Sequence, residues 1–165
     1  MRLDDAPEHE FIEAMTPVFE GAPRFVARLA AARPFGSPDL LFDRAIDIAL
    51  SMPEDEQIEL VDAHPRIGAP PGSVSALSFR EQGYDRSADS PVDIATELEQ
   101  LNDAYEQRFG FRYCVFVAGR SRPALIPGFE EALGRRRDDE LPRALRDVVA
   151  IARARLEQAR AGVTA

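Results

Sequence analysis

Residues 37–64 read SPDLLFDRAIDIALSMPEDEQIELVDAH and contain two apolar patterns of helical spacing, each opening at a proline. Proline is well tolerated at the first helical position, because its missing N–H group would have no intrahelical partner there. Ser37 stands where an N-cap accepts a hydrogen bond, and the three acids after Pro53 complement the helix dipole. This stretch predicts two helices, the second ending near His64.

Comparable start signals recur along the rest of the chain. Helix starts are expected at Pro17, Pro23, Pro38, Pro53, near Ser75, at Pro91, at Pro123 and at Asp138 or Asp139. Residues 111–118 are aromatic and β-branched, but one strand cannot pair with itself. They are expected as a buried irregular segment or the start of a helix. We predict an all-α, single-domain helical bundle of about eight helices spanning residues 1–165, with residues 1–20 at its periphery.

Composition excludes several classes of protein. The chain has 165 residues and a net charge of −9, which suits one domain and opposes binding to nucleic acid or an anionic membrane surface. Its single cysteine, Cys114, excludes an internal disulfide and a multi-cysteine metal site. No run approaches the ~20 apolar residues of a membrane span, and the N-terminus lacks the layout of a signal peptide. We expect a soluble cytoplasmic protein with no nucleic-acid or membrane partner.

Unusual polar residues gather in residues 64–68, His-Pro-Arg-Ile-Gly, and in residues 78–82, Ser-Phe-Arg-Glu-Gln. His64 is one of two histidines, and the proline after it favours a non-helical backbone. Arg66 and Glu81 add one charge of each sign within a short span. A rare titratable group beside fixed charges, on a loop at the end of a helix, indicates a candidate site for chemistry.

Each of these residues also has a structural interpretation. His64 could cap the carbonyl groups at its helix end, and Arg66 and Glu81 could be surface charges. Cys114, in its apolar run, fits a small core residue better than a nucleophile. Arg155 borders the apolar stripe of the last helix. No spacing of ligands indicates a metal site, so the residue pattern alone reaches only an all-helical domain with a polar loop.

Five motifs extend this interpretation. They are Arg33-Pro34-Phe35 with Leu40-Leu41, His64-Pro65-Arg66-Ile67-Gly68, Ser78-x-x-Glu81-Gln82, Leu101-Asn102-x-x-Tyr105-x-x-x-Phe109-Gly110-Phe111, and Ile151-Ala152-x-x-Arg155-Leu156. In this order and spacing the chain resembles the 2-oxo-4-hydroxy-4-carboxy-5-ureidoimidazoline (OHCU) decarboxylase family of the route from urate to allantoin. The resemblance covers residues from about 33 to 156. It implies an all-helical fold, a homodimer and a reaction that needs no cofactor and no metal.

The resemblance also implies roles for individual residues. Catalysis would fall to His64, Glu81 and Arg155. Contacts with a small ureide substrate would come from Pro65, Ser78, Phe79, Arg80, Gln82, Tyr113, Cys114, Val115, Phe116 and Val117. The implied reaction is decarboxylation of OHCU to S-allantoin. Two alternatives stay open: a non-catalytic helical interaction module, and a decarboxylase of a related ureide.

The residue types suit this chemistry. The carboxyl-bearing carbon of OHCU adjoins a ring C=N carbon, so the substrate carries its own electron sink. His64 can take a proton from the hydroxyl group and return one to carbon, while Glu81 orients the imidazole or binds ureido N–H groups. Arg155 would lower the barrier to decarboxylation only if its guanidinium faces the ring atoms where negative charge collects. Main-chain groups of residues 113–117 can bind a planar ureide.

Overall fold

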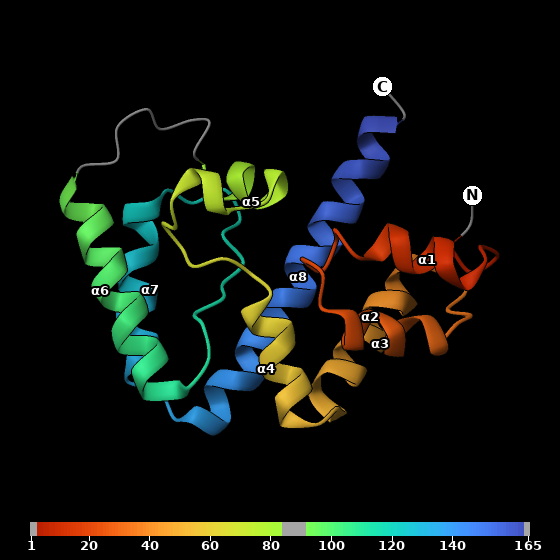
Figure 1. Cartoon of the computed structure of the whole chain (residues 1–165), viewed down its shortest axis with the longest axis horizontal. Coiled ribbons are helices and arrows are strands. Elements are labelled where there is room, and N and C mark those ends of the chain that lie inside the picture. Colours follow the sequence, from red (N-terminus) through yellow and green to blue (C-terminus); the bar gives the residue numbers. More distant parts are fainter. Residues whose placement is uncertain (1–2, 84–91, 164–165) are drawn as a thin grey trace. The chain divides into compact units, whose positions relative to one another are not determined.

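The computed structural model describes residues 3–83 and 92–163, and these ranges contain eight α-helices, one short 3-10 helix and no strand (Figure 1). The elements are α1 (Glu8–Met15), α2 (Pro23–Ala31), α3 (Pro38–Ser51), α4 (Glu54–Asp62), η1 (Pro71–Ser73), α5 (Ala76–Glu81), α6 (Val92–Phe109), α7 (Arg122–Leu133) and α8 (Arg137–Val163). The predicted all-α class is confirmed. Within these ranges, no helix is both long enough and apolar enough to cross a membrane.

The chain divides into two compact units, Met1–Ala63 with Leu145–Ala165, and His64–Ala144. The assignment of residues 1–165 to a single domain stays a prediction. In the first unit α2 packs against α1, α3 and α4. Residues 3–20, expected at the periphery, supply the almost fully buried Phe11, Met15 and Phe19 to the core of this unit. The Phe19 and Phe25 rings meet edge to face, with centroids 4.9 Å apart.

The expected helix at Pro17 is wrong, because the N-terminal helix, α1, comes earlier. Residues 16–20 form a turn in which the Gly21 N–H donates to the Thr16 carbonyl over 2.8 Å. The chain then passes through positive φ angles at Glu20 (54°) and Gly21 (104°), which end helical geometry. The N-cap expected at Ser37 is confirmed, since its side chain accepts from the Leu40 N–H at 3.2 Å.

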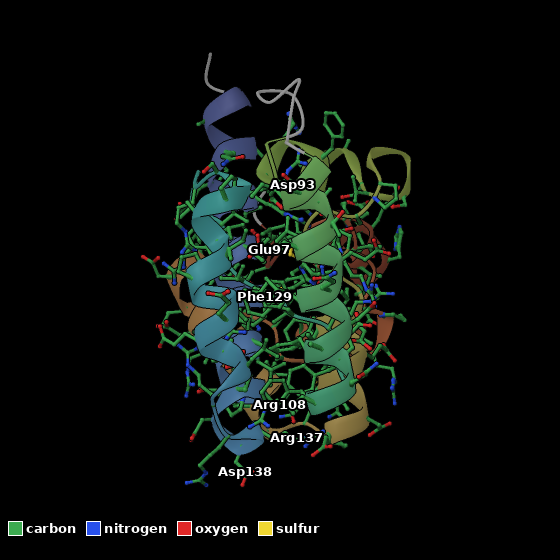
Figure 2. The ribbon with its side chains drawn as sticks, turned by 90° about the vertical axis from the view of Figure 1, so that its left-hand side faces the viewer. Asp93, Glu97, Arg108, Phe129, Arg137 and Asp138 are labelled. Atoms are coloured by element: carbon green, nitrogen blue, oxygen red, sulfur yellow. The ribbon has the colours of Figure 1, made fainter. Side chains whose placement is uncertain are left out.

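In the second unit α6 and α7 lie side by side, and Figure 2 shows the labelled Phe129 of α7 between them. The Phe129 ring stacks on Tyr113 with centroids 3.8 Å apart, and Tyr105 meets Tyr113 edge to face at 5.1 Å. The Tyr105 hydroxyl donates to the fully buried Glu140 carboxylate at 2.7 Å, and burial together with this bond raises the pKa of Tyr105. Arg143 Nε donates to the same carboxylate at 2.8 Å. The core of this unit is thus aromatic and includes one buried carboxylate, that of Glu140, which accepts from Tyr105 and Arg143.

Of the two alternatives for residues 111–118, the irregular segment is observed. The glycine before it, Gly110, has φ +79° and donates its N–H to the Glu106 carbonyl at 2.9 Å, as expected for a helix C-cap. The last helix begins at Arg137, so the predicted cap at Asp138 or Asp139 is wrong: both acids lie in its first turn. The opening of the helix expected at Pro91 lies outside the described residues.

Candidate active site

The loop of residues 64–68 begins two residues after the end of α4. The C-cap of α4 is Ala63, so the expected place of His64 beyond a helix C-terminus is confirmed. His64 is only 4% exposed. Its carbonyl accepts a hydrogen bond from Arg112 Nη1 at 3.3 Å. A buried imidazole next to a conformationally restricted proline has little freedom to change its position.

Arg66 ties this loop to α6. Its Nε donates to Glu106 Oε1 at 2.8 Å, its Nη2 contacts Glu106 Oε2, and the same nitrogen lies 3.0 Å from Asp103 Oδ1. The hydrogen bond to Glu106 raises the pKa of Arg66 above its ordinary value. The guanidinium is therefore occupied by α6, and its role is to hold the loop.

Two buried amides hold the next peptide groups of the loop. Gln82 accepts from the Gly68 N–H at 2.8 Å and donates to the Arg66 carbonyl at 3.2 Å. Asn102 of α6 donates to the Ile67 carbonyl at 2.9 Å. Gly68 has φ +78°, and a Cβ added there would lie 3.0 Å from Leu98 Cδ1, so this position favours glycine for both its backbone angle and its packing.

The short helix α5 carries the second predicted group of site residues. It opens at Ser75, whose hydroxyl accepts from the Ser78 N–H at 3.1 Å. Its residues differ in exposure: Ser78 and Gln82 are buried, Phe79 and Glu81 are half-buried, and Arg80 is exposed. The roles of these residues in binding and catalysis, including that of Glu81, stay predictions.

The irregular segment of residues 113–117 is anchored through its carbonyl groups. Arg143 Nη1 donates to the Cys114 carbonyl at 3.0 Å, and Arg120 donates to the Phe116 carbonyl at 2.7 Å and the Val117 carbonyl at 2.9 Å. Cys114 is 4% exposed, as a core residue would be. The segment therefore keeps an irregular backbone that Arg143 of α8 and Arg120, just before α7, hold in place.

Arg155 belongs to the other unit and is 4% exposed. Its Nη1 donates to the carbonyls of Pro17 and Val18 at 3.2 and 3.3 Å, and its Nη2 pairs with Glu20 Oε1 at 2.9 Å. The guanidinium is thus oriented by the turn that follows α1. Its participation in the same site as His64 stays a prediction.

The sequence pattern of the family described as OHCU decarboxylase matches residues 4–157. The chain belongs to the OHCU decarboxylase family. It is 30% identical over 159 residues to the 2-oxo-4-hydroxy-4-carboxy-5-ureidoimidazoline decarboxylase of Halalkalicoccus jeotgali, covering 94% of this chain and 88% of that protein. It is 26% identical to the uric acid degradation bifunctional protein of Bacillus sp. (strain TB-90), of which it spans only 31%.

A solved structure supports the fold of the OHCU decarboxylase family for this chain. The crystal structure of OHCU decarboxylase in the presence of (S)-allantoin superposes with a TM-score of 0.69 at 22% identity. The match covers 88% of this chain and 96% of that one. At this identity the likeness concerns the all-helical architecture.

Two polar residues that contact predicted motif or site residues, Asn102 and Glu20, were not predicted from the sequence. Asn102 belongs to the motif that begins at Leu101. It comes four positions after Leu98 and so lies within the apolar stripe of its helix, although it is polar. A polar side chain at a buried helical position needs hydrogen-bond partners, and this was the available signal. Glu20 offered no such signal, because its partner Arg155 is 135 residues away.

Among residues 3–83 and 92–163, no group of three or more His, Cys, Asp or Glu side chains is arranged to hold a metal ion.

Proposed function

We propose that this chain decarboxylates OHCU to S-allantoin in urate degradation, with no cofactor. The observation that carries the proposal is the buried His64 at the head of a loop held by Gln82 and by Arg66 and Asn102. Membership of the OHCU decarboxylase family supplies the substrate class. The longer bifunctional relative is described as degrading uric acid, which supports the same pathway.

The proposed reaction has two stages. In the first, the bond between C4 and the carboxylate breaks and CO2 leaves. The electron pair forms a C4=C5 double bond, the ring imine pair moves to nitrogen, and that nitrogen takes a proton from solvent. In the second, His64 takes the proton of the C4 hydroxyl, the C4 carbonyl forms, and a proton is delivered to C5. An imidazole suits both transfers because its ordinary pKa lies near neutrality.

The other predicted residues have supporting roles in this scheme. Glu81 orients the imidazole or accepts from ureido N–H groups, and main-chain groups of residues 113–117 bind the planar ureide. Arg155 is proposed to face the ring atoms where negative charge develops, because a grip on the departing carboxylate would stabilise the ground state instead. The turn that holds Arg155 through Pro17, Val18 and Glu20 suits such a fixed orientation.

The family resemblance also supports two finer proposals, a homodimer and a cytoplasmic location. Sedimentation velocity of the purified chain tests the first. A species of one chain mass of 18.3 kDa across the working concentrations would contradict it.

The direct test adds purified protein to freshly generated OHCU and follows its loss optically. Substitution His64→Asn keeps the size and some hydrogen bonding of the side chain but removes the titrating group, and a kcat loss of about 10²–10⁴-fold is expected. His9→Asn is the matched control, since His9 is the other histidine and is exposed on α1. It should leave turnover unchanged.

Stability measured on the same variants separates catalysis from capping. A capping histidine contributes at most about 2 kcal/mol, so His64→Asn with a lowered melting temperature and near-normal kcat would refute the catalytic role. If the protein turns over a related ureide and does not turn over OHCU, the related ureide is its substrate. Arg155→Lys should also lose activity, because an ammonium cannot reproduce a planar fork of donors.

A further inference from the structure

Asn102 is a buried amide that acts as a donor. It is 2% exposed, and its Nδ2 donates to the Leu98 carbonyl of its own helix at 2.8 Å and to the Ile67 carbonyl at 2.9 Å. Its Oδ1 is buried and accepts no hydrogen bond from any described residue. The reversed amide would turn Oδ1 toward two carbonyl oxygens, so only this orientation is favourable. Among the described residues, the bond to Ile67 is therefore the one hydrogen bond from this side chain to a segment outside its own helix.

The link acts on a loop with few free torsions. Between His64 and Ile67 lie Pro65, whose ring restricts φ, and Arg66, whose guanidinium is held by Glu106. Ile67 itself is buried, at 5% exposure. A displacement of the Ile67 peptide group would therefore be passed along the backbone to His64 with little relaxation in between.

We propose that Asn102 is a positioning residue of the site: it holds the Ile67 carbonyl on α6 and so sets the position of the His64 imidazole. The proposal rests on the proposed function, in which His64 moves the proton. Gln82 holds the adjoining peptide groups from the side of α5. Asn102 supplies a backbone attachment to α6, beside the side-chain attachment that Arg66 makes to Glu106 of the same helix.

The test uses Asn102→Asp in the full chain, with kcat and KM measured on OHCU. Aspartate keeps the shape of the side chain, but as a carboxylate it has no donor for the Ile67 carbonyl. A misplacement of about 1 Å can cost on the order of 100-fold in rate, so we expect kcat to fall by up to about 100-fold with a smaller change in KM. Asn102→Ala removes the amide without adding a charge. It replaces the aspartate variant in these measurements if that variant does not fold.

The spectroscopic readout is the imidazole of His64, observed by NMR in a His9→Asn background so that one histidine remains. We expect one set of His64 signals with Asn102, and shifted, broadened or doubled signals with Asp or Ala in its place. Ala132→Gly, at a fully buried position of α7 in the same unit, is the stability control. It should lower the melting temperature without moving the His64 signals.

Two results would overturn the proposal. Wild-type kcat and wild-type His64 signals in the Asn102 variants would leave Asn102 a purely structural role, whatever their melting temperature. A fall in kcat with unchanged His64 signals would show that Asn102 does not act through His64. The NMR comparison needs no turnover, so it decides the positioning even if His64→Asn proves active and the proposed function fails.

Discussion

Gly68→Ala tests how tightly the loop of residues 64–68 packs against α6. Gly68 has φ +78°, and an added Cβ would lie 3.0 Å from Leu98 Cδ1 and 3.4 Å from Leu98 Cβ. A left-handed backbone costs an L-residue about 1–2 kcal/mol, and overpacking adds about 1–3 kcal/mol. Alanine also lowers the conformational entropy of the unfolded chain, which offsets about 0.4–1 kcal/mol of these two costs. The expected loss of unfolding free energy is therefore about 1–5 kcal/mol.

Two other glycines of the same unit separate these contributions. Gly110 has almost the same backbone angle, φ +79°, but a Cβ there would meet no atom within 4 Å. Gly110→Ala should therefore show the backbone cost alone. Gly72 has neither a positive φ nor a close neighbour, so Gly72→Ala should be neutral or slightly stabilising. The difference between the Gly68 and Gly110 variants measures the contact with Leu98.

The assay is urea unfolding followed by circular dichroism at the helical band. A Gly68→Ala variant no less stable than Gly110→Ala would refute the argument from Leu98. The combination with Leu98→Ala provides a second check, because the cost of Gly68→Ala should shrink once the opposing side chain is cut back. Additive losses would show that the two positions do not touch.

Three further predictions concern other parts of the chain. Arg155→Met leaves the Glu20 carboxylate, 11% exposed, without its cation and should cost about 3–5 kcal/mol in urea unfolding; a loss below 1 kcal/mol would contradict the buried pair. Cys114→Ala should keep near-normal turnover, because the arginine contact of Cys114 is to its carbonyl; complete inactivation would indicate thiol chemistry. Hydrogen bonds from the arginines of α2 lower the pKa of Asp55 and Glu56, so their stabilisation is present above about pH 4 and is lost as the pH falls through the lower folded values. The double variant Asp55→Asn, Glu56→Gln should lose less stability in acid than the parent chain, and equal acid sensitivity would refute this assignment.

Much of the helical framework could be predicted from the sequence, because its signals are local. Pro38 after Ser37 begins a helix through its own backbone restriction and its neighbour's hydroxyl group. Gly110 ends one because it accepts a positive φ without strain. The helix at Glu8–Met15 was missed although Pro7 and the acids of its first turn repeat the start signal that Pro53 and its acids give to α4. The family motifs added the candidate residues His64, Glu81 and Arg155, which spacing alone left open.

The sequence by itself determined the all-α class, most helix starts and the polar loop at His64, since each depends on residues within a few positions of one another. The tertiary structure decided the partners. Asn102 reaches Ile67 across 35 positions, and Glu20 reaches Arg155 across 135. No periodicity encodes such pairings. They form because a buried donor must find an acceptor, and the packing of distant helices determines which acceptor lies within reach.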